Sequence, residues 1–153
     1  MATSAPGQTV VGAATGTDVR PVMLLTLNTP LDPAAVRFAI ETALETGAEL
    51  LVCDAVPLAV GQPTSSAVRT FGDREALDGC TSAAAEARAR GARVSEMLFH
   101  HPRPLTAAAR VCSEHGVGLL VFGADRRRLG RWRFRMAVRR LRRDVTCLVW
   151  LNE

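Results

Sequence analysis

The chain contains no lysine, so all 19 of its basic residues are arginine. Without lysine the chain cannot form the glycine-rich phosphate loop in which a lysine contacts the nucleotide phosphates. The Gly-x-Ser-x-Gly turn of serine hydrolases and the His-Glu-x-x-His zinc motif are absent as well. We therefore expect no enzymatic activity and no catalytic residues.

Paired metal ligands are also lacking. The four cysteines lie about thirty residues apart without a Cys-x-x-Cys pair, a spacing that fits neither a zinc site nor a secreted disulfide framework. They are Cys53, Cys80, Cys112 and Cys147. We interpret them as small core residues of a protein in a reducing cytoplasm. His100 and His101 are adjacent on a predicted strand, so their side chains point to opposite faces and we expect no metal site.

Long apolar runs are missing too. No run approaches the roughly 18 residues that a membrane helix needs. The segment Met1–Gly7 lacks the charged and apolar regions of a signal peptide. We expect a cytoplasmic protein with no membrane partner. Its 153 residues correspond to about one domain, large enough to bury a core without metals or disulfides.

Predicted strands and helices alternate along most of the chain. Residues 1–20 are small and polar without periodicity and are predicted to form a disordered tail, which leaves 21–153 as the domain. The apolar run 22–27 predicts a buried strand, and a helix is expected from Asp32-Pro33 to Gly47. Further strands are expected at 50–53, 92–100, 117–122 and 145–151, further helices at 73–90, 104–115 and 131–143, and a loop at 57–72. This order predicts an α/β fold with one doubly wound, open, parallel five-stranded sheet.

Three segments of this arrangement resemble the universal stress protein family. They are Met23–Pro30, Leu119–Gly123 and Val145–Trp150. The resemblance covers residues 21–153 and implies a flavodoxin-like strand order of 3-2-1-4-5. It also implies a stress-response or regulatory role and, commonly, a homodimer formed along the last strand.

The resemblance further implies where a nucleotide would bind. ATP-binding members carry an aspartate after the first strand and, after the fourth, the pattern Gly, two residues, Gly, nine residues, then Gly and Ser or Thr. Asn28 stands at the aspartate, Gly123 matches the first glycine and Arg126 occupies the second position. Gly130 matches the second glycine only if about three residues are inserted. The final pair falls on Met136-Ala137 or on neighbouring Arg and Phe positions, so the Gly with Ser or Thr is missing on either alignment.

We interpret these departures as a degenerate ATP motif and expect no cofactor. A phosphate loop uses glycine to let the backbone approach phosphate oxygens, and a hydroxyl at the helix start. The alternative that an ATP-, AMP- or other phosphate-bearing ligand binds in a changed way stays open. The candidate ligand residues are Asn28, Thr29, Gly123, Arg126, Gly130 and Arg131.

Basic charge is concentrated near the C-terminal end. Ten arginines lie between Arg126 and Arg143 with no acidic residue among them. One explanation is that these arginines lie on a solvent-exposed helix face, where their aliphatic stems cover apolar surface. An anion near residues 126–131 also explains it, because arginines at a helix N-terminus are otherwise unfavourable. A further alternative is that this helix binds nucleic acid or an acidic partner protein, and nucleic acid is the less favoured of the two because no recognised reading motif is present. The candidate partner-binding residues are Arg135, Arg139, Arg142, Arg143 and Val149, the last from a strand apolar on both faces that predicts a homodimer.

Overall fold

The structure, a computed structural model, describes residues 19–58 and 71–153. The elements run in the order β2 (Val22–Thr26), α2 (Pro33–Thr46), β3 (Leu50–Pro57), α3 (Phe71–Ala89), β4 (Val94–His101), α4 (Pro104–His115), β5 (Leu119–Phe122), α5 (Arg126–Leu129), α6 (Arg131–Asp144) and β6 (Leu148–Leu151). The predicted tail lies almost wholly outside the described residues, as does most of the predicted loop at 57–72.

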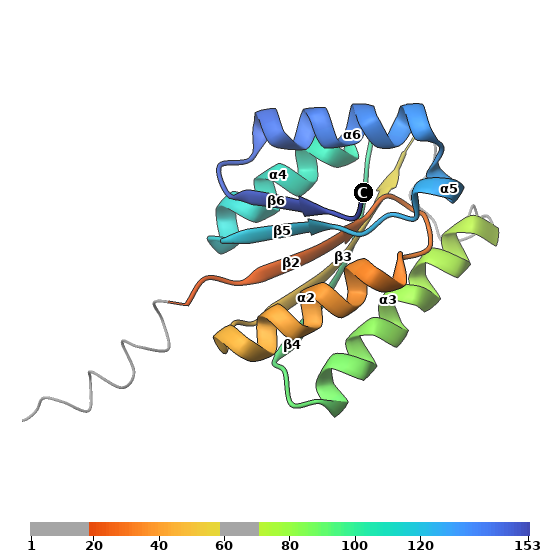
Figure 1. The fold of residues 1–153 in the computed structure, drawn as a ribbon. Coiled ribbons are helices and arrows are strands. Elements are labelled where there is room, and N and C mark those ends of the chain that lie inside the picture. The colour runs from red at the N-terminus through yellow and green to blue at the C-terminus, as the bar shows by residue number, and fades with distance from the viewer. Residues whose placement is uncertain (1–18, 59–70) are drawn as a thin grey trace, which may run out of the picture.

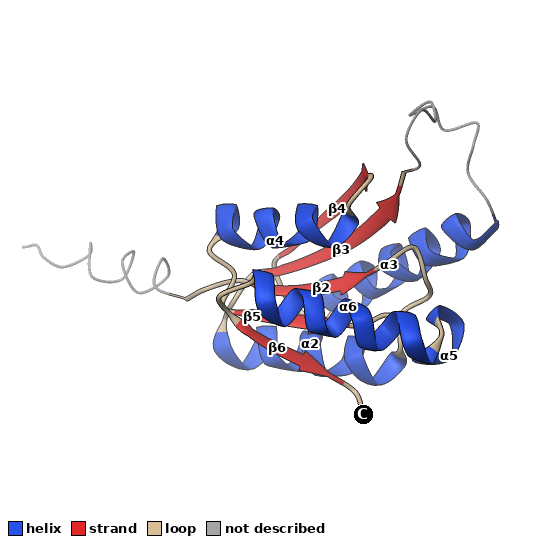
Figure 2. Ribbon diagram, turned by 90° about the horizontal axis from the view of Figure 1, so that it is seen from above, coloured by secondary structure: helices blue, strands red, loops and turns tan. Residues whose placement is uncertain are grey.

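Five parallel strands form one sheet in the order β4-β3-β2-β5-β6. Numbered along the chain, the strands lie in the order 3-2-1-4-5, which confirms the expected fold class. Helices α4 and α6 cover one face of the sheet, and α2 and α3 cover the other (Figure 1). Seen from above, the helices run alongside the strands they connect (Figure 2). The sheet is thus buried on both faces, as parallel sheets generally are.

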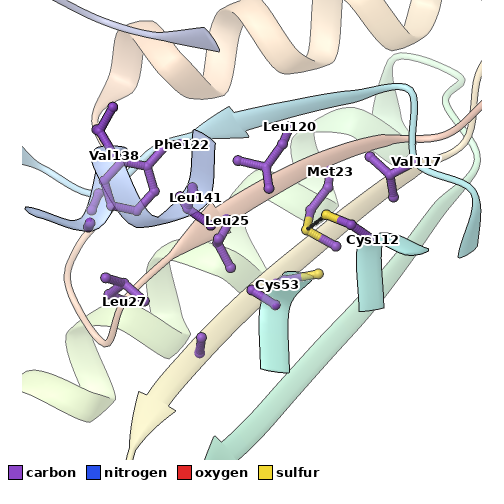
Figure 3. Packing of buried hydrophobic residues seen from close by; sticks show 14 of the residues in the cluster. Met23, Leu25, Leu27, Cys53, Cys112, Val117, Leu120, Phe122, Val138 and Leu141 are labelled. Carbon is purple, nitrogen blue, oxygen red and sulfur yellow. Dashed lines mark hydrogen bonds between the residues drawn. The ribbon is translucent and has the colours of Figure 1, made fainter. Parts of the chain in front are cut away.

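The central strand β2 shows why an uninterrupted apolar run is needed here. All five of its residues are buried, and successive side chains point to opposite faces. Met23 and Leu25 pack with α4 and α6 on one face, whereas Val22 and Leu24 pack with α2 and α3 on the other. The thiol of Cys112 on α4 lies 3.6 Å from the sulfur of Met23 in this core (Figure 3).

Local signals explain most of the helix boundaries. Asp32 caps α2 by accepting a hydrogen bond from the N–H of Ala34, and Pro33 fills the first turn. Gly47 ends α2 in the left-handed conformation, with φ of 73°. Gly116 ends α4 in the same way. These three boundaries were expected, and they are confirmed.

Two departures from the expected elements lie near the candidate site. The short helix α5 was not predicted; Asp125 initiates it by accepting from the N–H of Arg127. The last strand begins at Leu148 rather than Val145, because Val145 still donates its N–H to Leu141 at the end of α6. The other boundaries coincide with the expected ones or differ from them by at most four residues, as the ranges above show.

Candidate functional site

Two loops meet at the carboxyl ends of β2 and β5, where open α/β sheets usually bind ligands. The N–H of Gly123 donates to Leu25 at 2.8 Å, and the carbonyl of Gly123 accepts from Asp32 at 2.8 Å. The N–H of Asp125 donates to Pro30 at 2.9 Å. Hydrogen bonds between backbone groups therefore hold the two loops closely together.

Two polar residues after β2, Asn28 and Thr29, form hydrogen bonds that stabilise the loop itself. Asn28 adopts a left-handed conformation with φ of 51°, and its N–H donates to the buried carboxylate of Asp54 at 2.8 Å. Thr29 is buried, and its hydroxyl donates to the carbonyl of Leu27 at 2.7 Å. Both were predicted to face a ligand, and that stays a prediction. The backbone of Asn28 and the hydroxyl of Thr29 hold the loop in shape, whereas the side-chain oxygen of Asn28 is buried and has no hydrogen-bond partner among the described residues.

Gly123 is a glycine because its neighbours leave no room for a side chain. A Cβ atom at this position would lie 2.8 Å from Leu24 Cδ1 and 2.9 Å from Leu31 Cδ2. Both distances are shorter than real Cβ contacts allow. The packing of β2 and α2 against the loop therefore accounts for this glycine without any ligand.

The N–H groups after β5 are largely occupied. The loop folds into α5 and passes directly into α6 at Gly130, which has φ of 98° and supplies no side-chain cap. The N–H groups that donate within the chain are those of Gly123, Asp125, Arg127, Arg128, Leu129 and Gly130. The loop from Gly123 to Gly130 therefore presents few N–H groups to a phosphate, whereas the first N–H groups of α6, from Arg131 to Arg133, receive no side-chain cap.

The arginines of α5 do not form one cluster. The guanidinium of Arg126 lies 4.6 Å from the centroid of the Phe134 ring, on the side of the molecule next to β6. Arg128 instead forms an ion pair with Glu75 of α3 at 2.7 Å. The two side chains therefore leave α5 in different directions, and an anion site shared by 126–128 has no support in this geometry.

A basic groove runs between α6 and β6 and has a volume of about 750 Å³. Its floor is apolar, and its polar lining within 19–58 and 71–153 consists of arginines. The lining residues are Arg126, Arg131, Phe134, Arg135, Val138, Arg139, Arg142 and Leu151. The groove thus brings together two candidate ligand residues, Arg126 and Arg131, with three candidate partner residues, Arg135, Arg139 and Arg142.

The other two candidate partner residues lie elsewhere. Arg143 forms an ion pair with its neighbour Asp144 at 3.1 Å. Val149 is half-buried and packs against the core on the face covered by α4 and α6. The exposed apolar side chain of β6 is Leu148, with a relative exposure of 75%.

A second cavity, of about 360 Å³, opens between the start of α4 and the opposite side of α6. Leu27 and Pro57 border it at the carboxyl ends of β2 and β3, and Trp132 lines it with 70% of its surface exposed. Its cationic lining consists of Arg103, Arg133 and Arg140. The sequence reasoning missed this cavity, although an exposed tryptophan among arginines was the available signal.

The remaining ionisable groups offer little chemistry. Within 19–58 and 71–153, no group of three or more histidine, cysteine or acidic residues is arranged so that it could hold a metal ion. Burial raises the pKa of the Cys80 and Cys112 thiols to about 12, and it raises the pKa of Cys53 and Cys147 as well. All four cysteines are free thiols.

No helix in the described part of the chain is long and apolar enough to cross a membrane.

Comparison with known proteins decides the family. A family model described as "Universal stress protein family" matches residues 19–151. The chain belongs to the universal stress protein family. Residues 136 and 137, where the family pattern would place its final Gly and Ser or Thr, lie inside α6 of this universal stress protein, past its first turn.

Solved universal stress proteins share the fold. The structure of one from Archaeoglobus fulgidus is 18% identical with a TM-score of 0.64, and covers 92% of this chain and 98% of its own. The Archaeoglobus fulgidus protein in complex with dAMP is 20% identical, with a TM-score of 0.63 and coverages of 88% and 98%. A universal stress protein in complex with cAMP is 17% identical, with a TM-score of 0.62 and coverages of 87% and 97%. A search of curated proteins finds no match.

Proposed function

We propose that this universal stress protein is a cytoplasmic, non-enzymatic regulatory domain of the stress response that does not bind ATP in the family manner. The observation that carries the proposal is the occupied backbone of the loop after β5. Six N–H groups from Gly123 to Gly130 donate to oxygens of the chain itself. A phosphate could recruit them only by breaking hydrogen bonds within the domain, and a buried N–H or C=O left without a partner is costly.

Side chains at the other positions of the motif support the same proposal. Asn28 has an amide where a carboxylate would accept from a ribose hydroxyl or an adenine amine. Arg126 places a long side chain where the pattern has a glycine, and this side chain lies over Phe134. Met136 is 40% exposed on α6 and offers no hydroxyl. Arg126 and Met136 do not provide the groups on which the family pattern relies, whereas the amide oxygen of Asn28 can still accept a hydrogen bond but carries no charge.

Calorimetric titration with ATP tests this proposal. We expect no saturable heat at micromolar concentrations of ATP. The loop variant Asn28→Gly removes the amide side chain and keeps the positive φ accessible, so it should behave like the parent. A micromolar affinity for ATP that Asn28→Gly reduces would overturn the proposal. Release of phosphate from ATP above a control without protein would overturn its non-enzymatic part.

A second candidate function is nucleotide binding in the cavity between α4 and α6. Its volume lies within the range of about 300–1,000 Å³ that small-molecule sites usually occupy. The exposed ring of Trp132 could stack on a base, and Arg103, Arg133 and Arg140 could pair with a phosphate. The related proteins solved with dAMP and cAMP make these two nucleotides the appropriate probes.

The tryptophan discriminates this candidate from the first proposal. If a nucleotide binds in this cavity, dAMP should quench the fluorescence of Trp132, and Trp132→Leu should abolish both the quenching and the binding heat. Trp150 stacks on Phe38 on the opposite face of the sheet, with ring centroids 4.2 Å apart, and serves as the internal control fluorophore. Absence of quenching at millimolar dAMP would remove this candidate.

We further propose that the chain forms a homodimer through β6. This strand lies at the edge of the sheet, and Leu148 exposes an apolar side chain there. An uncovered edge strand of this kind is a liability unless it is paired. Light scattering should give twice the mass of one chain, and Leu148→Arg should give the mass of one chain. A monomer at micromolar concentrations in the parent protein would contradict the proposal.

A further inference from the structure

The basic groove contains a regular row of cations. Four of its arginines follow one another at intervals of about one helical turn along α6, which corresponds to about 5–6 Å between neighbours. Arg126 extends the row beyond the start of this helix. We call these five residues the arginine row: Arg126, Arg131, Arg135, Arg139 and Arg142. All five are exposed.

No acidic side chain of the described residues neutralises the arginine row. The ion pairs within 19–58 and 71–153 join Arg88 to Glu96, Arg128 to Glu75 and Arg143 to Asp144. None of them includes a member of the row. Because like charges one turn apart on a helix repel each other, the row destabilises α6 in the free protein. An anionic partner would relieve this repulsion along the whole groove.

We propose that the arginine row binds an extended, acidic segment of a partner protein. In an extended chain, side chains on one face recur every second residue, about 6.6–6.8 Å apart. This repeat is close to the spacing of the row, so alternate carboxylates would meet successive guanidinium groups. A guanidinium binds a carboxylate through two parallel hydrogen bonds, which makes arginine better suited than lysine to this contact.

The floor of the groove specifies the segment further. Phe134, Val138 and Leu151 form an apolar base between the row and β6. Phe134 and Val138 are already buried, so the partly exposed Leu151 is the part of this base that an apolar residue of the acidic segment would cover. The class of partner is therefore an acidic segment with at least one aliphatic or aromatic residue.

The aromatic residues of α6 favour a polypeptide over a single-stranded nucleic acid. Proteins that bind single strands combine basic grooves with exposed rings on which bases stack. Among the described residues that line this groove, the only aromatic ring is that of Phe134, which is buried and lies against Arg126. Trp132 is exposed, but it lines the cavity on the other side of the helix. Bases entering the groove would therefore find no ring to stack on.

The test is a fluorescence anisotropy titration of the full chain with a labelled peptide in which Glu alternates with Ala around a central Leu. We expect saturable binding that weakens as salt is raised. Arg135→Gln with Arg139→Gln should weaken binding by about tenfold or more, because two charge-assisted contacts are lost. The matched control removes the same charge from exposed arginines outside both cavities, Arg90→Gln with Arg110→Gln, and should change affinity by less than about twofold.

Several outcomes would overturn the proposal. Equal weakening by both double variants would mean that net charge alone attracts the peptide. Tighter binding of a labelled oligothymidylate than of the peptide would assign the groove to nucleic acid. Loss of peptide binding as the protein concentration rises would assign it to a second copy of the chain. If the glutamine variant does not fold, Arg135→Lys with Arg139→Lys keeps the charge and should still weaken binding several-fold, since the paired hydrogen bonds are lost. Unchanged affinity in that lysine variant would contradict the proposal.

Discussion

The crevice at the carboxyl ends of β2 and β5 and the groove along α6 differ in how their polar groups are satisfied. In the crevice, Gly123, Thr29 and Asp125 form hydrogen bonds within the chain. In the groove, five arginines face solvent without a carboxylate among the described residues. Unpaired positive charge therefore gathers on a helix face, whereas at the sheet end the side-chain oxygen of Asn28 is left, among the described residues, without a hydrogen-bond partner.

One stretch of sequence produces both regions. Asp125 starts α5 immediately after the loop, and Gly130 leads straight into α6, so the backbone N–H groups enter helices instead of a phosphate loop. The same residues carry the arginines that begin the row. The segment from 123 to 142 therefore both occupies the N–H groups of the crevice and supplies the arginines of the groove.

Raising the pH should disrupt the scaffold that both regions share, and this is the largest effect we expect. Burial raises the pKa of Cys80 and Cys112 to about 12, whereas an exposed thiol has a pKa of about 8.5. The unfolded chain therefore loses these protons first, and stability that is complete below about pH 8.5 falls as the pH rises above it. Each such thiol should cost up to about 1.4 kcal/mol per pH unit.

Urea unfolding at pH 7 and pH 10 measures this loss. Replacing Cys80 and Cys112 with alanine should flatten the dependence on pH while lowering stability at pH 7. In parallel, a thiol reagent at pH 7 should label Cys53, Cys80 and Cys112 only after denaturation. Rapid labelling of the native protein would show that the core is more open than the structure implies.

Gly123→Ala should lower the free energy of unfolding by disturbing the packing around the crevice. The added methyl group would overlap Leu24 and Leu31, and overpacking of this kind typically costs about 1–3 kcal/mol. Gly79 provides a matched control, because a Cβ there would also approach Leu31 but at an ordinary 3.8 Å. Since Gly79 lies inside α3, Gly79→Ala should stabilise the protein by about 0.5–1 kcal/mol. If the two variants have equal free energies of unfolding in urea, the loop at Gly123 accommodates a methyl group and is not tightly packed.

Asn28→Asp should restore the family's carboxylate without restoring ATP binding. The new charge would lie close to Asp54, which already accepts the N–H of residue 28. Repulsion between carboxylates should lower the free energy of unfolding by about 1 kcal/mol. Thermal denaturation compares it with Asn28→Gly, which adds no charge. A gain of micromolar affinity for ATP would mean that a single side chain, rather than the closed backbone, excludes the nucleotide.

Trp132→Leu should have the smallest effect on stability. Its ring is 70% exposed, and surface substitutions usually change stability by less than about 0.5 kcal/mol. A larger loss in thermal denaturation would show that the ring supports the packing of α6 against α4. A small loss leaves the tryptophan free to serve as a probe of the neighbouring cavity.

The elements of the fold could be predicted because their signals are local. The apolar run of β2, the Asp32-Pro33 start of α2 and the glycine ends at Gly47 and Gly116 each lie within a few residues of what they determine. The resemblance to the family supplied the strand order, which alternation of strands and helices alone leaves open.

The site could be predicted only in part because its contacts are not local. Nothing near Gly123 in the sequence shows that Leu24 and Leu31 would fill the space beside it. The helical period predicted that the arginines of α6 face away from the sheet, but the ion pair of Arg128 with Glu75 joins residues 53 positions apart. Consequently the sequence suggested one arginine cluster where the structure has a groove and a separate ion pair.

The most direct test of the account is to map the backbone amide signals of the protein by NMR during two titrations, one with ATP and one with the acidic peptide. We expect ATP to leave the amide signals of Gly123 to Gly130 unchanged. We expect the peptide to shift the amide signals of Arg135 and Arg139 on α6. Saturable shifts at Gly123 and Arg126 with ATP, together with unchanged signals of α6 in the peptide titration, would contradict both proposals.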